Sequence, residues 1–128
     1  MARIVAFIPD LLFGSNVVGA LQAAGHEPVL VSDPYAVRGE LQGTQLLVVD
    51  LTADASERLE QLEGIPGTIK TLAFYSHVEA DVRAQAERAG FDLVVPRSRM
   101  AREGASLVDR LVESKGETPE GRPDRESG

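Results

Sequence analysis

Side chains that could perform chemistry stand at the ends of short apolar runs in this sequence. Asp50 ends the run "QLLVVD", Asp10 follows "RIVAFIP", and Arg97 follows "DLVVP". Residues 75–77, Tyr-Ser-His, follow the run "TLAF". Carboxylates bind divalent cations or attack phosphoryl donors, and a guanidinium pairs with anions. These groups can act together only if the chain brings the ends of the runs to one place.

The apolar runs predict five β-strands that alternate with five helical segments. The central runs are apolar throughout, which is typical of parallel strands covered on both faces. An alternating order implies right-handed crossovers and a parallel sheet with helices on both faces. In such a sheet, reactive groups gather beyond the carboxyl ends of the strands. The predicted strands are 3–8, 27–32, 45–51, 71–76 and 92–96, and the predicted helices are 14–26, 34–41, 54–67, 76–91 and 100–114.

Capping residues suggest where two of these helices begin and end. Ser15 is the expected N-cap of the first helix, and Gly25 is its expected stop. Ser76 is expected to cap the fourth helix, which Gly90 closes. For Tyr75, packing in the core is the favoured interpretation.

Composition limits the classes of protein that the chain can belong to. Its 128 residues suit one compact domain. The absence of cysteine removes disulfide and thiolate chemistry and fits a cytoplasmic location. The apolar runs are too short to span a membrane, and a net charge of −7 argues against binding to nucleic acid or anionic lipid. Residues 1–114 are the expected domain, and residues 115–128, which have no apolar side chain except proline, are an expected disordered tail.

The strand ends and their order resemble the receiver domain of bacterial response regulators over residues 3–113. The resemblance lies in the five-fold strand–helix order, in "LLVVDL" with its terminal Asp50, and in "AGFDLVVPRS". It implies a flavodoxin-like three-layer αβα sandwich with strand order 2-1-3-4-5. It also implies that Asp50 is the phosphoacceptor, and that Tyr75 or Ser76 and Arg97 occupy the positions that contact the phosphoryl group.

Several of the family's site residues are replaced. Receivers carry two adjacent acids after the first strand, which hold Mg²⁺ with the phosphorylated aspartate; here the place reads Ile8-Pro9-Asp10. Asp10 and Asp50 are therefore the candidate metal ligands, and Mg²⁺ is the cofactor to consider. We expect an ionised Asp50 that is paired with or close to Arg97 and is phosphorylated slowly or not at all. The domain is then an atypical receiver.

The expected role is non-enzymatic signalling by a stand-alone module that contacts a protein, either a sensor kinase, a downstream target or a second copy. The cluster Arg97, Arg99 and Arg102, close to the acids Glu79 and Asp81, marks a candidate contact face. The alternative is a small-molecule or nucleotide-binding domain that uses the same sheet edge. G-x-G-x-x-G and P-loop motifs are absent. An enzyme built around Asp50 and His77 is the least favoured interpretation.

Overall fold

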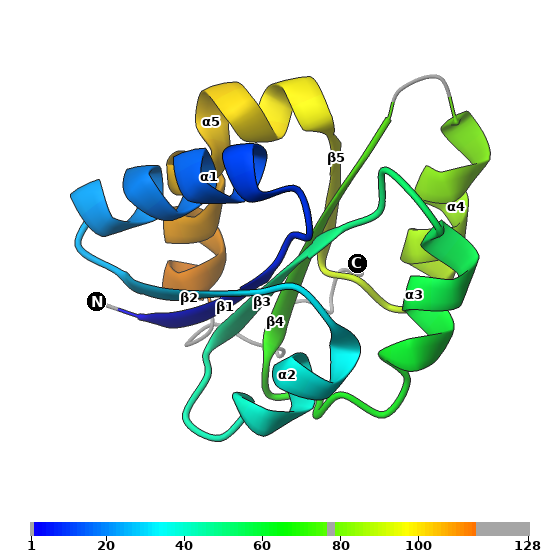
Figure 1. Ribbon diagram of the computed structural model, residues 1–128, viewed down its shortest axis with the longest axis horizontal. Coiled ribbons are helices and arrows are strands. Elements are labelled where there is room, and N and C mark those ends of the chain that lie inside the picture. The colour runs from blue at the N-terminus through cyan, green and yellow to red at the C-terminus, as the bar shows by residue number, and fades with distance from the viewer. Residues whose placement is uncertain (1, 77–78, 115–128) are drawn as a thin grey trace.

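The computed structural model describes residues 2–76 and 79–114. Five parallel strands form one sheet in the order β2-β1-β3-β4-β5, with helices on both faces (Figure 1). This is the predicted three-layer α/β fold with the predicted strand order. The elements are β1 (Arg3–Phe7), α1 (Leu11–Ala23), β2 (Glu27–Val31), α2 (Pro34–Gly39), β3 (Leu46–Asp50), α3 (Ala55–Gln61), β4 (Lys70–Tyr75), α4 (Ala80–Arg88), β5 (Leu93–Pro96) and α5 (Arg97–Glu113). No helix within the described residues is long and apolar enough to cross a membrane.

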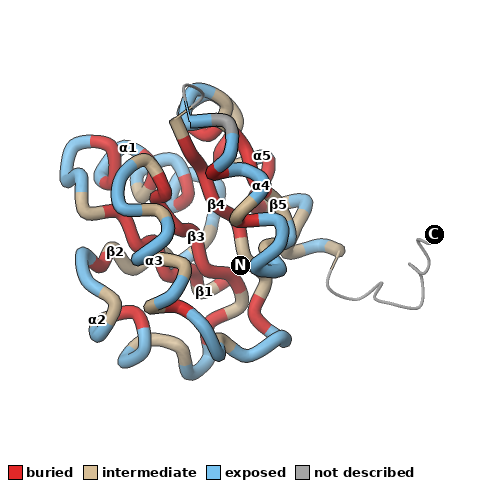
Figure 2. Tube along the Cα trace, turned by 90° about the vertical axis from the view of Figure 1, so that its right-hand side faces the viewer, coloured by how far each residue is buried: buried red, intermediate tan, exposed pale blue. Residues whose placement is uncertain are grey.

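Each face of the sheet has its own apolar cluster. Side chains of α1 and α5 pack on one face, and side chains of α2, α3 and α4 pack on the other. Alternate residues of a strand point to opposite faces, so Leu46 and Val48 join the first cluster while Leu47 and Val49 join the second. Figure 2 shows the central strands as the buried part of the molecule. Burial on both faces explains why β3 is apolar until its last residue.

Three helices begin three or four residues away from their predicted starts. The first helix begins at Leu11 and not at Ser15, because Asp10 caps it by accepting a hydrogen bond from the Phe13 backbone N–H at 3.1 Å. Helix α4 begins at Ala80 with Glu79 as its N-cap, so Ser76 does not cap it. The last helix begins at Arg97, three residues before the predicted start. These shifts place Asp10 and Arg97 directly at the starts of α1 and α5.

Two glycines allow α1 to fit against the sheet. A Cβ at Gly14 would lie 2.9 Å from a methyl group of Leu30, so α1 approaches β2 more closely than a larger residue would permit. Gly25 has φ +91° and turns the chain after α1, as the sequence predicted. The turn brings His26 beneath α5, where its Nε2 lies 2.6 Å from Asp109 Oδ1. The first and last helices are therefore fixed on the same face.

The predicted tail lies outside the described residues, and so does His77. The division into a 1–114 domain and a tail remains a prediction from composition.

Candidate functional site

The parallel topology brings the ends of β1, β3, β4 and β5 to one edge of the sheet. Asp50 is the last residue of β3, Tyr75 the last residue of β4, and Arg97 directly follows β5. Asp10 lies three residues beyond β1. These four predicted site residues are thus at the carboxyl edge, and so is the fifth, Ser76, which directly follows Tyr75, as expected for an open α/β sheet. What the edge can do depends on the partner of each side chain.

Asp50 is held inside the protein by its own loop. It is the only buried carboxylate among the described residues, with 4% of its surface exposed. Its Oδ1 accepts a hydrogen bond from the Thr52 backbone N–H at 2.8 Å and another from the Thr52 hydroxyl at 2.5 Å. An aspartate side chain that accepts a hydrogen bond from the backbone N–H two residues later forms an Asx turn. Asp50 therefore shapes the β3–α3 loop and does not cap the helix that follows.

A cation from α3 neutralises this carboxylate. Arg58 Nη1 donates a hydrogen bond to the Asp50 carbonyl oxygen at 2.6 Å and lies 3.8 Å from Asp50 Oδ1. The guanidinium also lies over the Phe7 ring, 5.6 Å from its centroid. Only 14% of the Arg58 side chain is exposed. Because arginine keeps its charge at all physiological pH values, Arg58 is a permanent counter-ion for Asp50.

The expected pairing of Asp50 with Arg97 is wrong. Arg97 Nη2 lies 3.5 Å from Asp10 Oδ2, and its guanidinium lies over the Phe13 ring at 4.2 Å from the centroid. Two separate pairs, Asp50 with Arg58 and Asp10 with Arg97, thus replace the expected one. The reason is the early start of α1 and α5, which sets Asp10, Phe13 and Arg97 next to one another.

The two candidate metal ligands do not fit a magnesium site. Asp50 Oδ1 accepts two hydrogen bonds from Thr52 and lies beside the Arg58 guanidinium. Asp10 Oδ1 accepts a hydrogen bond from the N-terminus of α1, and Asp10 Oδ2 lies beside Arg97. Within the described residues, no three acidic or imidazole groups converge on a common point. Mg²⁺ requires several oxygen ligands in a nearly octahedral arrangement. The charge that a metal would supply near Asp50 is supplied here by Arg58.

Tyr75 takes part in the core. Its side chain is buried in the cluster on the α2, α3 and α4 face, which confirms the packing interpretation. The pKa of Arg83 in α4 is raised above its usual value, chiefly by the Glu87 carboxylate and to a lesser degree by a hydrogen bond and charge interaction with Tyr75. The Tyr75 phenol is thus one of the groups close to Arg83. Ser76 follows it in a partly buried position, and its carbonyl accepts a hydrogen bond from the Glu79 N–H.

The β3–α3 loop carries a backbone feature of its own. Asp54, the N-cap of α3, has φ 53° and ψ 40°, the only positive φ of a non-glycine residue in the part of the chain that the structure describes. A left-handed residue with a side chain costs conformational energy, and such residues often lie at functional loops. Asp54 directly precedes α3, the helix that carries Arg58.

Arg58 is the functional residue that the sequence analysis missed. A signal was present, because Arg58 is the only lysine or arginine between residues 39 and 69. A single cation in an acidic segment that follows a buried aspartate is a candidate partner for that aspartate. Its spacing of eight residues from Asp50 gave no local motif, because the contact depends on the turn between β3 and α3.

The fold can be compared with known structures. A CheY-like response regulator receiver domain protein from Methanospirillum hungatei JF-1 superimposes with a TM-score of 0.77 and 14% identity over 91% of this chain and 97% of that one. A response regulator receiver domain protein from Clostridium thermocellum gives a TM-score of 0.76 and 13% identity over 91% and 98%. NtrX from Brucella abortus, crystallised in complex with ADP, gives a TM-score of 0.78 and 17% identity over 90% of this chain. The match covers only 27% of the NtrX chain.

Sequence comparisons add no closer relationship. No protein-family model matches the chain, and no curated protein matches its sequence. The three structures named above each share less than a fifth of their aligned residues with it. The chain has the fold of response regulator receiver domains, with the sheet order and helix arrangement that the resemblance implied.

Proposed function

We propose that this chain is a receiver-like signalling module that acts by contacting a protein partner, and that Asp50 is phosphorylated slowly or not at all. The pairing of Asp50 with Arg58 carries this proposal. The receiver fold supports the signalling role, since it covers about nine-tenths of the chain. The proposal is for a non-enzymatic protein of the cytoplasm.

Access to the carboxylate is the first obstacle to phosphorylation. A phosphoryl donor must approach a free carboxylate oxygen in line with its leaving group. Asp50 is almost fully buried, and Thr52 donates two hydrogen bonds to Oδ1. The donor would have to open the β3–α3 loop before it could react. Arg58 can stabilise negative charge, but it cannot coordinate donor and acceptor oxygens together as a metal ion does.

The readout of a phosphoryl group is the second obstacle. Tyr75 is buried in the apolar cluster on the α2, α3 and α4 face. Arg97 is held by Asp10 and by the Phe13 ring. Neither side chain can move toward Asp50 without giving up these contacts. We therefore propose that the domain stays mainly in one conformation and is recognised in that form.

Mass spectrometry of the intact protein tests the phosphorylation part of this proposal. The full chain is incubated with Mg²⁺ and a small phosphodonor, beside a receiver domain that has the complete set of acids as positive control. We expect the control to gain one phosphoryl group and this chain to gain little or none. Rapid addition of one group that is lost in Asp50→Asn would show a working phosphoacceptor and refute the locked state.

The face formed by α4, β5 and α5 is the proposed contact surface for a partner or a second copy. Two of its cations form ion pairs within α5. Arg99 pairs with Glu103 at 3.3 Å, and Arg102 pairs with the same carboxylate at 3.6 Å. Sedimentation of the wild type and of Arg99→Glu, with affinity capture of partners by both, tests the surface. A monomer at high concentration together with unchanged captured proteins would refute it.

A further inference from the structure

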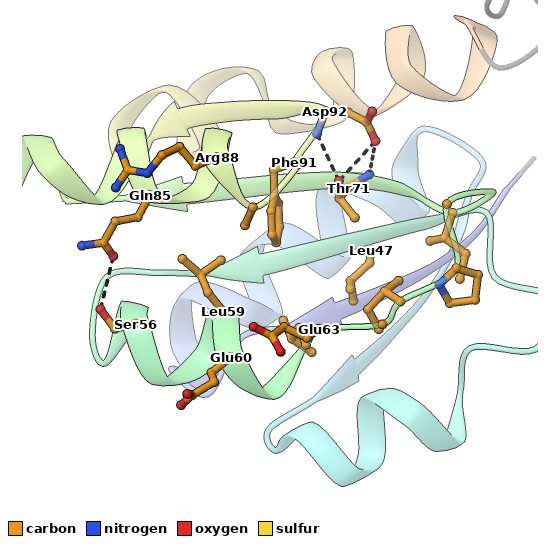
Figure 3. A pocket seen from close by; sticks show the side chains of 18 of the residues that line it. Leu47, Ser56, Leu59, Glu60, Glu63, Thr71, Gln85, Arg88, Phe91 and Asp92 are labelled. Atoms are coloured by element: carbon orange, nitrogen blue, oxygen red, sulfur yellow. Dashed lines mark hydrogen bonds between the residues drawn. The ribbon is translucent and has the colours of Figure 1, made fainter.

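A groove of about 830 Å³ runs between α3 and α4, away from the pairs at the carboxyl edge. Figure 3 shows its two walls and Phe91 between them. At the end of the groove shown on the left of Figure 3, the two walls are joined by a hydrogen bond that the Ser56 hydroxyl donates to Gln85 Oε1 at 3.3 Å. The loop from Gly64 to Gly67 closes the other end. The groove has a volume within the range of about 300–1,000 Å³ that is typical of small-molecule sites.

The floor of the groove is apolar. Leu59, Ile65 and Phe91 are partly buried and pack against the cluster on this face of the sheet. Leu47 of the central strand and Ile69 lie beneath them. Because the three upper side chains keep exposed apolar surface, an apolar ligand would gain free energy by covering them. Phe91 also presents an aromatic ring, which attracts cations to its face.

The α3 wall gives the groove a negative charge. Glu57, Glu60 and Glu63 are spaced three residues apart on α3 and in the turn after it, and all three line the groove. No ion pair joins Glu60 or Glu63 to another described residue. On the α4 side the groove has one cation, Arg88, whose guanidinium points away from the Phe91 ring in Figure 3.

Asp92 does not add a free charge to the groove. Its carboxylate accepts hydrogen bonds from the Thr71 backbone N–H at 2.8 Å and from the Thr71 hydroxyl at 3.2 Å (Figure 3). This exchange joins the start of β5 to the start of β4 and fixes Phe91 in place. The groove therefore combines a positioned aromatic ring, an aliphatic floor and one acidic wall.

We propose that this groove binds a small organic cation with an apolar, ring-sized body. The body would cover Phe91, Leu59 and Ile65, and the positive group would lie at the acidic wall, nearest Glu63. A partner helix lying along the groove fits less well, because α3, with 7 residues, offers only about 10 Å of wall, or about two helical turns of contact. The proposal does not depend on Asp50 or on the receiver-like function.

Chemical shifts of the backbone amides test the site with a defined probe. The ¹⁵N-labelled full chain is titrated with protonated 2-phenylethylamine and, separately, with 3-phenylpropanoate, which has a similar body and the opposite charge. We expect saturable shifts for the amine at residues 59–67 and 85–92, and clearly weaker binding of the carboxylate. Added salt should weaken the binding of the amine, because the acidic wall is exposed.

A matched pair of variants separates the acidic wall from the net charge of the protein. Glu60→Gln with Glu63→Gln should weaken amine binding about threefold or more, as expected for the loss of two nearby charges. Glu27→Gln with Glu113→Gln removes two exposed carboxylates outside the groove and should leave the affinity unchanged.

Three results would overturn the proposal. These are an absence of saturable shifts in the groove, equal binding of amine and carboxylate, and equal weakening in both variants. Shifts of the same amides by a basic amphipathic peptide, without any response to the amine, would assign the groove to a protein partner and also refute the small-ligand proposal.

Discussion

Arg58 Nη1 lies 2.6 Å from the carbonyl oxygen of Asp50 and 3.8 Å from its Oδ1, so one guanidinium serves both the backbone and the carboxylate of the same residue. The buried aspartate of the central strand thus has an internal cation. At this carboxyl edge the charge of the central aspartate is balanced by an arginine of the same chain, and not by a metal ion. The first prediction follows from this pairing.

Arg58→Ala is expected to destabilise the fold by about 2–4 kcal/mol, because it leaves the buried Asp50 carboxylate without a counter-ion. Asp50→Asn combined with Arg58→Ala should cost less than the sum of the single changes, since the neutral amide needs no cation. Urea denaturation measures all three variants. The control is Arg83→Ala, which breaks the exposed pair with Glu87 and should change stability by less than about 0.5 kcal/mol. Equal losses of unfolding free energy in Arg58→Ala and Arg83→Ala would show that the buried pair stabilises the fold no more than an exposed pair does.

Asp54 is expected to tolerate glycine better than alanine. Its φ of 53° lies in the left-handed region, where glycine has no steric penalty and a residue with a Cβ is penalised by about 1–2 kcal/mol. Its side chain makes no capping hydrogen bond that either substitution would remove. Thermal unfolding should therefore rank Asp54→Gly above Asp54→Ala. The reverse order would mean that the loop adopts a different backbone conformation in solution.

Nε2 of His26, and not Nδ1, is expected to carry the ring proton. Its Nδ1 accepts a hydrogen bond from the Ala2 N–H at 3.2 Å, so the proton must be on Nε2, which lies 2.6 Å from Asp109 Oδ1. Long-range ¹H–¹⁵N spectra of the ring distinguish the two tautomers. A proton on Nδ1 would contradict the hydrogen bond from Ala2.

The same contact should contribute to stability. His26→Ala removes a nearly buried ring that joins the start of β1 to α5, and we expect a loss of about 1–3 kcal/mol in urea denaturation. Asp109→Asn keeps an acceptor oxygen at the same place and should cost less. If Asp109→Asn costs as much as His26→Ala, charge and not the hydrogen bond maintains the contact.

Removal of residues 115–128 should leave the thermal midpoint unchanged, because this segment has no apolar side chain except proline to bury. Truncation after Ser114 and differential scanning calorimetry provide the test. A clear drop in the midpoint would mean that the segment docks on the domain.

The sequence by itself determined the architecture. The apolar runs of the central strands are long enough and uniform enough to require cover on both faces, and their alternation with amphipathic segments leaves a parallel sheet as the solution. From this followed the position of Asp50, Tyr75 and Arg97 at one edge. The glycine stop after α1 was also readable, because the turn there needs a positive φ.

Only the tertiary structure decided which charges meet at that edge. Asp50 and Arg58 are eight residues apart and meet across the β3–α3 loop, in which Asp54 is left-handed, and Asp10 meets Arg97 because α1 and α5 both begin earlier than predicted. Pairing depends on distances of a few ångströms, and these are set by packing and not by local sequence. The sequence therefore specified the sheet and its reactive edge, while the packing of α1, α3 and α5 selected the partner of each carboxylate.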